Sequence, residues 1–295
     1  MSTFRAVLCA ALSYVLLPAA ALADTPSRAV VDKALAAGNY AVCATLYSQI
    51  ADAANNGDDG YNAACCYALA GDKDAAFERL NKTISAGFVG VSQIEQDEDF
   101  NSLHDDSRWM PLLAFARQEA DRHLAGVDRD LRRELGERVD RDQAILNRWM
   151  ADPQNKALGE EAVRIYADNT AWMKQVIATH GWPGYKLVYM DGEDDAWLLV
   201  QHADQDPEFQ QQALALLEKA VMEKDADPKH LAYLTDRVRT HRGEKQLYGT
   251  QLTGEGDKMV PFPIEDEAHV DERRQRIGLG PLADYIEQAR VIYSH

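Results

Sequence analysis

Two predicted helices and the end of a third carry polar residues where their apolar faces should continue. Asp142 and Asn169 each replace an apolar residue in the middle of a helical stripe, and Gln201 and His202 follow an apolar run. A buried carboxylate or amide without a partner costs about 1 to 3 kcal/mol or more, so such residues need hydrogen bonds or a ligand. These positions therefore predict either a functional site or an internal hydrogen-bond network.

His202 is the member of this set best suited to acid–base chemistry, because imidazole titrates near neutral pH. We expect Asp142 or Asp236 to orient the imidazole and Arg237 to hold an anionic group. The other predicted ligand-binding residues are amides and one phenol, namely Asn169, Gln201, Gln246, Tyr248 and Gln251. A single site requires His202 to lie within about 8 Å of Asp142, Asp236 or Gln251, since hydrogen bonds reach only about 3 Å. In the alternative interpretation the same residues form a satisfied network that only fixes helix register, with Asp236 and Arg237 paired elsewhere.

Motifs for other catalytic chemistries are absent from the sequence. It has no H-E-x-x-H, C-x-x-C or G-x-S-x-G motif and no glycine-rich phosphate loop, so we expect no metal and no cofactor. His104-Asp105-Asp106, and His180 with His202, match no known metal-ligand spacing. Three further histidines are expected at the surface: His230, His241 and His295. We interpret the acidic runs at 96–99 and 191–195 as solvated loops or helix starts.

Apolar periodicity predicts the helices that must position the polar residues. One helical stripe starts near Asp128 and stops at Asp152-Pro153, and a second ends at the glycine-rich break 180–184. A third helix is expected around 195–202. The remaining expected elements are helices from Pro207, from Pro228, at 270–277 and at 281–293, and a small hairpin with arms at 246–251 and 259–264.

Four short motifs follow one another in the C-terminal half of the chain. They are His-Gly-Trp-Pro at 180–183, Gln-His-Ala at 201–203, Asp-Arg-Val at 236–238 and Tyr-Gly-Thr-Gln at 248–251. In this order they resemble a bacterial family known only as a domain of unknown function. The similarity runs from about residue 130 to the segment 278–282 and includes Asp142-Gln143 and Asp168-Asn169. The resemblance implies no activity.

Two turns in the N-terminal part, Gly38-Asn39 and Gly71-Asp72, lie 33 positions apart. At that offset small and apolar residues align, which lets antiparallel helices pack closely. The pattern resembles the tetratricopeptide repeat, which has two helices and a period of about 34 residues. Phe100, Leu103 and Trp109 then resemble the closing element that follows such repeats. Repeats of this kind bind a peptide or another domain, whereas so short an array would alternatively pack only on its own C-terminal neighbour.

Residues 1–23 have the layout of a cleaved secretory signal, with one early cation, Arg5, an apolar run, and small residues before Asp24. The apolar run is shorter than the roughly 20 residues that a spanning helix needs. After cleavage three cysteines would remain: Cys43, Cys65 and Cys66. A disulfide from Cys43 to Cys65 or to Cys66 would suit an oxidising compartment, but we expect instead that all three are buried thiols.

The negative net charge of the chain argues against polyanionic partners. The sequence has 295 residues, 48 acidic and 31 basic, for a formal net charge of -17, and 46% of it is hydrophobic. Binding of nucleic acid or of an anionic membrane surface requires concentrated Lys and Arg, which the sequence lacks. The composition instead fits a folded, acidic protein.

These patterns predict a mainly α protein in which tetratricopeptide-like helical hairpins precede a helical domain with a small β-hairpin. The expected parts are a signal peptide at 1–23, a repeat region at 24–118 and a domain of unknown function at 127–295. Our first functional hypothesis is a periplasmic or secreted module that binds a protein or peptide partner through the repeat region. The alternative is a periplasmic enzyme, such as a hydrolase, with a buried polar pocket centred on His202 and a small polar ligand.

Overall fold

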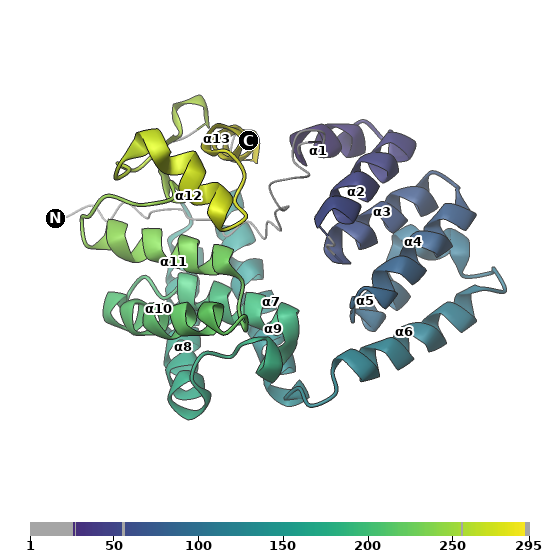
Figure 1. The fold of residues 1–295 in the computed structure, drawn as a ribbon, viewed down its shortest axis with the longest axis horizontal. Coiled ribbons are helices and arrows are strands. Elements are labelled where there is room, and N and C mark those ends of the chain that lie inside the picture. The colour runs from purple at the N-terminus through teal and green to yellow at the C-terminus, as the bar shows by residue number, and fades with distance from the viewer. Residues whose placement is uncertain (1–25, 27, 55–56, 255, 293–295) are drawn as a thin grey trace. The chain divides into compact units, whose positions relative to one another are not determined.

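The protein is mainly helical, with one small two-stranded hairpin (Figure 1). The computed structural model describes residues 26, 28–54, 57–254 and 256–292. This architecture confirms the predicted fold class. The proposed signal peptide and His295 lie outside the described residues. Within the described part of the chain, no helix combines the length and the hydropathy needed to cross a membrane.

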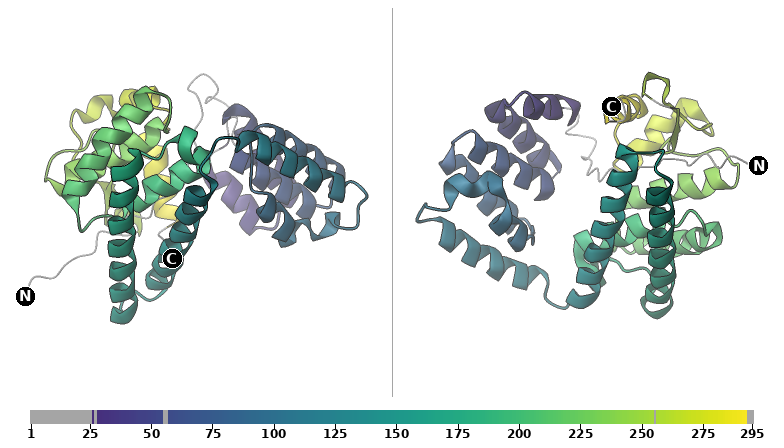
Figure 2. Two further views of the ribbon diagram at one scale, coloured as in Figure 1. Left: turned by 90° about the horizontal axis from the view of Figure 1, so that it is seen from below. Right: turned by 180° about the vertical axis from the view of Figure 1, so that it is seen from behind.

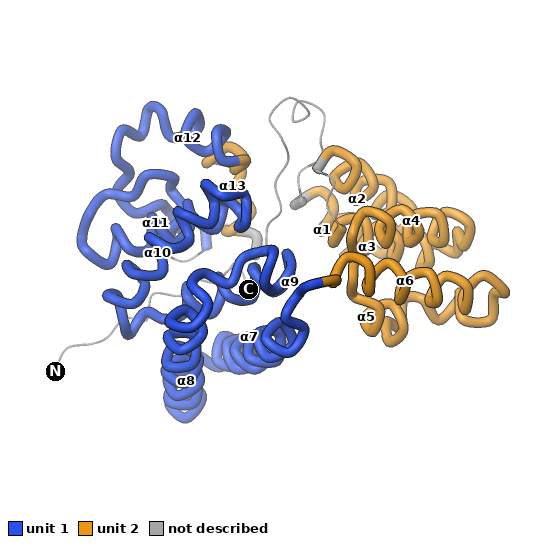
Figure 3. The backbone as a smooth tube through the Cα atoms, turned by 60° about the horizontal axis from the view of Figure 1, so that its bottom comes forward, with its two compact units in different colours: residues 1–13, 126–277 blue, residues 14–125, 278–295 orange. Residues whose placement is uncertain are grey.

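The described chain divides into two compact units (Figure 3). One unit comprises residues 126–277. The other comprises the described residues up to 125 together with residues 278–292. The last helix of the chain, α13 (Leu282–Ile292), is therefore grouped with the N-terminal helices and contacts the first of them.

Four helices of the N-terminal unit follow one another as two pairs. They are α1 (Arg28–Ala36), α2 (Tyr40–Ala54), α3 (Gly57–Leu69) and α4 (Lys73–Ser85). Tight turns at Gly38 and Gly71 separate the members of each pair, and both glycines have positive φ, 67° and 81°, which residues with a side chain rarely adopt. Asp72 then caps α4 by accepting a hydrogen bond from the backbone N–H of Ala75 at 3.0 Å. The predicted turns are confirmed, although paired helices alone do not identify a repeat family.

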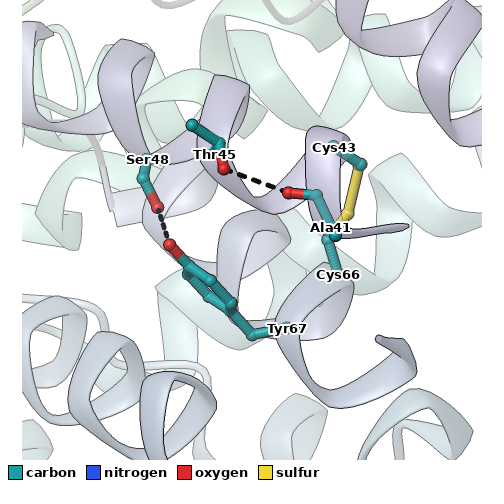
Figure 4. Close-up of a disulfide and its surroundings, with 6 residues drawn as sticks. All are labelled: Ala41, Cys43, Thr45, Ser48, Cys66 and Tyr67. Carbon is teal, nitrogen blue, oxygen red and sulfur yellow. Dashed lines mark hydrogen bonds between the residues drawn. A yellow bond between two sulfur atoms is a disulfide. The ribbon is translucent and has the colours of Figure 1, made fainter. Parts of the chain in front are cut away.

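A disulfide joins α2 to α3 through Cys43 and Cys66 (Figure 4). Both cysteines are buried in a small core with Val31, Ala44, Tyr47, Ile50 and Ala63. Cys65 is a free, buried thiol that donates a hydrogen bond to Oδ2 of Asp97 at 3.6 Å. The expectation of three buried thiols is therefore wrong for Cys43 and Cys66. Adjacent residues of a helix point in different directions, which is why Cys66 reaches Cys43 and Cys65 does not.

The rest of this unit builds a second core. Its elements are α5 (Val91–Gln96), the 3-10 helix η2 (Glu98–Leu103) and α6 (Trp109–His123). Phe100, Leu103 and Trp109 are buried there against residues of α3 and α4. These large apolar side chains thus fill the space beside the second helix pair.

Five helices form the frame of the C-terminal unit. They are α7 (Arg129–Ala151), α8 (Lys156–His180), α9 (Tyr185–Gln201), α10 (Pro207–Met222) and α11 (Pro228–His241). α7 packs against α8 and α9, and α10 packs against α11 (Figure 2). Each of four helix starts is capped by a side chain that accepts a backbone N–H, from Asp128, Asn155, Asp206 and Asp227. The predicted helix starts at Pro207 and Pro228 are confirmed.

α9 begins at Tyr185, well before the predicted start near residue 195. Tyr189 interrupts the helix with a φ of 65°, so the apolar period is lost in its first turns. Gly184 precedes α9, where a Cβ atom would lie 2.3 Å from the carbonyl oxygen of Asp225. Glycine is therefore required for this close approach of two backbone segments.

The predicted hairpin is present, but its strands are short. β1 (Leu252–Thr253) pairs antiparallel with β2 (Val260–Pro261). Gln246 forms an isolated bridge with Ile264. The remaining short elements are η3 (Gly256–Lys258), η4 (Glu267–His269) and α12 (Val270–Arg276). Most of the predicted first arm, 246–251, is a loop because its backbone N–H groups bond to side chains instead of to a strand.

Candidate functional site

The imidazole of His202 is bound to the carboxylate of Asp142. His202 ends α9 and Asp142 lies in the middle of α7. Nδ1 of His202 is 2.6 Å from Oδ1 of Asp142. An ionised carboxylate only accepts hydrogen bonds, so Nδ1 carries the proton and donates. Asp142 is fully buried and His202 is 6% exposed. Of the two carboxylates predicted to orient the imidazole, Asp142 is therefore the one that does so.

The second ring nitrogen of His202, Nε2, differs from Nδ1 in its surroundings. None of the described residues hydrogen-bonds Nε2, and Nε2 is not among the described polar atoms that are sealed from solvent without a partner. With the proton on Nδ1, Nε2 presents a lone pair to solvent. A carboxylate on one imidazole nitrogen and an open lone pair on the other is the arrangement of a general base.

Asn169 of α8 completes the surroundings of Asp142. Its Nδ2 donates to Oδ2 of Asp142 at 3.4 Å, and Gln143 donates to Oδ1 of Asp142 at 3.1 Å. The Asn169 carbonyl oxygen accepts from Nη1 of Arg138 at 3.2 Å. Both carboxylate oxygens of Asp142 thus have donors, which holds the carboxylate in one orientation toward His202.

Gln201 turns toward α11 instead of toward Asp142. Its amide oxygen accepts from the backbone N–H of Leu234 and from the indole N–H of Trp197, at 3.0 Å each. Gln210 of α10, a fully buried residue that the sequence did not single out, donates to the carbonyls of Val200 and Gln201 at 3.1 Å each. Together the two amides fix the end of α9, and hence the position of His202.

Arg237 forms a bidentate ion pair with Asp204, two residues after His202. The guanidinium donates from Nε at 2.7 Å and from Nη2 at 2.6 Å. Burial alone would raise the pKa of Asp204, but the charge and hydrogen bonds of Arg237 outweigh it, so the pKa is lowered. This neutralisation argues against the predicted role of Arg237 in holding an anionic ligand. In the sequence Asp204 directly follows the motif Gln201-His202-Ala203, and this position could have marked it as part of the site.

Asp236 binds the loop after α11, and in the described structure it makes no hydrogen bond to the His202 imidazole. Its Oδ1 accepts from the backbone N–H of Leu247 at 2.6 Å, and its Oδ2 accepts from the backbone N–H of Thr250 at 2.9 Å. Tyr248 donates its backbone N–H to both oxygens at 3.1 Å. Burial raises the pKa of Asp236, partly offset by these hydrogen bonds. The contacts support a structural role for Asp236 rather than the predicted catalytic one.

The remaining predicted ligand-binding residues stabilise the same loop. Gln246 is fully buried, accepts from the backbone N–H of Gln251 at 2.9 Å and donates to the Gln251 carbonyl at 3.0 Å. Gln251 in turn accepts from Nη1 of Arg237 at 3.4 Å. Tyr248 lies partly exposed, with its carbonyl bound to Arg274 at 2.7 Å. The structure thus brings His202, Asp142 and Asn169 together and places the loop residues in a neighbouring network.

His230 and Glu193 form a second buried charge cluster, which the sequence did not predict. Nδ1 of His230 is 2.8 Å from Oε2 of Glu193, whose Oε1 accepts from the Trp182 indole at 3.0 Å. The His230 ring stacks on Trp197 with centroids 4.2 Å apart. Burial would lower the pKa of His230, but the charge and hydrogen bond of Glu193 raise it to about 9. The predictions of a surface His230 and of a solvated acidic run are therefore wrong here.

The metal-binding capacity of the described residues is confined to two groups. The first group is Glu193, Asp194 and His230, and the second is Cys65, Asp97 and Asp99. Within each group the ligand atoms lie within 4.8 Å of one another. In the first group both nitrogens of His230 already face carboxylates, at 2.8 Å and 3.3 Å. In the second, burial raises the pKa of the Cys65 thiol, which stays protonated and donates to Asp97.

The comparison with known families agrees with the motif resemblance. A model described as a family of unknown function, DUF6624, matches residues 129–294. The match begins with the first residue of α7 and includes every residue predicted for the site. No curated protein and no solved structure matches the sequence.

Proposed function

The chain belongs to DUF6624, a family of unknown function, and we propose that its C-terminal domain carries an acid–base site in which His202 accepts and donates a proton at Nε2. The observation that carries the proposal is the 2.6 Å contact between Nδ1 of His202 and Oδ1 of Asp142. This contact fixes the tautomer that leaves Nε2 basic. It also stabilises the imidazolium that forms when Nε2 takes up a proton.

The reaction that we propose is activation of a water molecule or of a substrate hydroxyl, as in a hydrolase. Nε2 would remove the proton from that oxygen while Asp142 balances the positive charge on the ring. Gln201, Gln210 and the Asp204–Arg237 pair support the site by fixing the end of α9 and the segment after it. Their role would be to position His202, not to contact substrate.

Labelling with diethyl pyrocarbonate, which acylates unprotonated imidazole nitrogens, tests the proposal in the folded protein. Peptide mass spectrometry should find His202 labelled, with the exposed His269 as a positive control. His230 should stay unlabelled until the protein is unfolded, because both of its nitrogens face carboxylates. Asp142→Asn should slow labelling of His202 and leave that of His269 unchanged. A His202 that stays unlabelled in the folded wild type would refute an accessible basic Nε2.

A second candidate function, protein binding by the N-terminal unit, is favoured by a hollow between α4 and α6. The hollow has a volume of about 290 Å³. Its lining residues are Phe77, Asn81, Ser107, Arg108, Pro111 and Leu112. Met110 beside it is 64% exposed. We propose that these paired helices are tetratricopeptide-like and bind a protein or peptide of the cell envelope.

This second proposal predicts position-specific cross-linking. A photoreactive residue at Met110 should capture a defined partner in cells, whereas one at the equally exposed Met222 of the other unit, 73% exposed, should not. Equal capture from both positions would argue against a binding surface on the N-terminal unit.

We propose further that the protein is exported to the periplasm or beyond. The signal-like composition of residues 1–23 and the Cys43–Cys66 disulfide support this location, because stable disulfides are rare in reducing compartments. Fractionation and N-terminal sequencing should find the chain outside the cytoplasm and beginning at Asp24. A cytoplasmic chain that retains residues 1–23 would contradict the proposal.

A further inference from the structure

Tyr166 of α8 is the aromatic neighbour of His202. The two ring centroids are 5.2 Å apart, with an angle of 54° between the ring planes. Tyr166 is half-buried, and within the described parts of the chain no group hydrogen-bonds its hydroxyl. The Tyr166 hydroxyl and Nε2 of His202, two polar atoms without a hydrogen-bond partner among the described residues, thus lie on neighbouring rings. Polar atoms in such places take their partners from solvent or from a ligand.

The Tyr166 phenol is a hydrogen-bond donor at every pH at which the protein is expected to be folded. Burial raises its pKa, and the negative charges of Asp142 and Asp204 raise it further against the opposing charge of Arg237. In the neutral imidazole with its proton on Nδ1, Nε2 of His202 is an acceptor. A hydroxyl both accepts and donates hydrogen bonds, so a hydroxyl-bearing ligand matches a phenol donor beside an imidazole acceptor.

The charges around these two rings disfavour an anion. Arg237 is paired with Asp204, and Arg138 is paired with Glu134 and Asp168, each at 2.8 Å. The guanidinium of Arg138 also lies 4.4 Å from the ring centroid of Trp172. Asp142 adds a further carboxylate to the site. Acidic groups therefore outnumber basic ones here, and the nearby cations are already neutralised.

We infer that the His202 site binds an uncharged or cationic hydroxyl-bearing ligand, such as a neutral or amino sugar, and that Tyr166 contacts this ligand beside His202. This inference rests on the acid–base site proposed above and adds its ligand class. A sugar-like ring suits the site by its chemistry, because its hydroxyls both donate and accept hydrogen bonds and its apolar face packs well against aromatic rings.

Three sugars that share one ring and differ in charge test the inference: N-acetylglucosamine, glucosamine and glucuronate. The experiment measures, for the full mature chain, the concentration of each sugar that protects His202 from labelling by diethyl pyrocarbonate. N-acetylglucosamine or glucosamine should protect, and glucuronate should not. Tyr166→Phe, which removes only the hydroxyl, should raise the protecting concentration about three- to tenfold, the loss expected for one hydrogen bond. Tyr185→Phe, at another half-buried tyrosine of the same unit, should leave the protecting concentration unchanged.

The outcomes separate this inference from the proposed function. Protection by glucuronate alone, or by none of the three sugars, overturns the ligand class while a labelled His202 still supports the acid–base site. Equal protection of wild type and Tyr166→Phe removes Tyr166 from the ligand contacts. A His202 that is never labelled refutes the acid–base site itself, and the inference with it.

Discussion

Nδ1 of His202 lies 2.6 Å from Oδ1 of Asp142, although 60 residues separate them in the sequence. The contact ties the end of α9 to the middle of α7. Because Asp142 is fully buried, the imidazole offsets much of the cost of placing a carboxylate there. In the neutral ring the same hydrogen bond leaves Nε2 as the basic atom, on which the proposed acid–base site depends.

Removing the imidazole should destabilise the protein strongly. In His202→Ala the carboxylate of Asp142 stays buried without its partner, so we expect the free energy of unfolding of the C-terminal unit to fall by about 3 to 5 kcal/mol. Urea denaturation measures the loss. Asp142→Asn combined with His202→Ala should lose less than the sum of the single variants, because the two residues interact. Additive losses would mean that the pair is not coupled.

Stability should fall as the pH rises toward 9, because His230 is protonated in the folded protein. Its folded pKa of about 9 lies above the unfolded value of 6.5. The stabilisation from its protonation is therefore complete below pH 6.5 and is lost as the pH passes through about 9. Between these values the free energy of unfolding should drop by up to about 1.4 kcal/mol per pH unit. Denaturation at a series of pH values measures the slope.

Glu193→Gln is the variant that isolates this effect. It removes the charge that raises the pKa of His230, so the slope between pH 7 and 9 should flatten. Glu265→Gln removes an exposed charge from the same unit and should keep the slope. The comparison starts at pH 7 because burial also raises the pKa of Asp195, to about 7, which adds a pH dependence below that value. An unchanged slope in Glu193→Gln would contradict a buried His230 imidazolium.

The carboxylate of Asp236 should protect the loop that it binds. Asp236→Ala removes the acceptor of the backbone N–H groups of Leu247, Tyr248 and Thr250. Hydrogen exchange at these amides should accelerate by about tenfold or more, since each lost bond costs about 1 kcal/mol. Asp206→Ala, which removes a helix cap from α10, should accelerate exchange at Phe209 and leave the loop unchanged. Unchanged loop exchange in Asp236→Ala would show that Asp236 does not hold it.

Reduction of the disulfide should destabilise the N-terminal unit. Opening the 23-residue link between Cys43 and Cys66 should lower its free energy of unfolding by about 3 kcal/mol. Cys43→Ser should show the same loss without reductant and no further loss with it. Cys65→Ser, at the free cysteine beside the bond, should keep the response to reductant. A wild type that is indifferent to reductant would contradict the disulfide.

The sequence predicted the long helices because their apolar stripes are regular and their ends carry local signals. α7 ends at the predicted Asp152, and α8 ends before Gly181, whose positive φ stops the helix. The start of α9 was missed because the left-handed backbone at Tyr189 interrupts the stripe. The first arm of the hairpin was predicted at 246–251 but forms at Leu252–Thr253, because Asp236, a residue of α11, takes backbone N–H groups of 247–250 that a strand would use.

The sequence predicted some residues of the site and missed others. A carboxylate in an apolar stripe marked Asp142 as buried, but only the packing of α7 on α9 decides that it, and not Asp236, meets His202. Glu193 was hidden by its acidic neighbours, although it stands one helical turn before Trp197 on the buried face. Tyr166 fits the apolar pattern of its helix, so nothing in the sequence marked its hydroxyl as one without a partner among the described residues.

The most direct test of the central claim is the protonation of the two ring nitrogens of His202, read from long-range ¹H–¹⁵N correlation spectra of histidine-labelled protein at neutral pH. The structure predicts a protonated Nδ1, with a proton signal shifted by its bond to Asp142, and an unprotonated Nε2. In Asp142→Asn the Nδ1 proton signal should lose that shift. A spectrum with the proton on Nε2 and a bare Nδ1 would contradict the acid–base site.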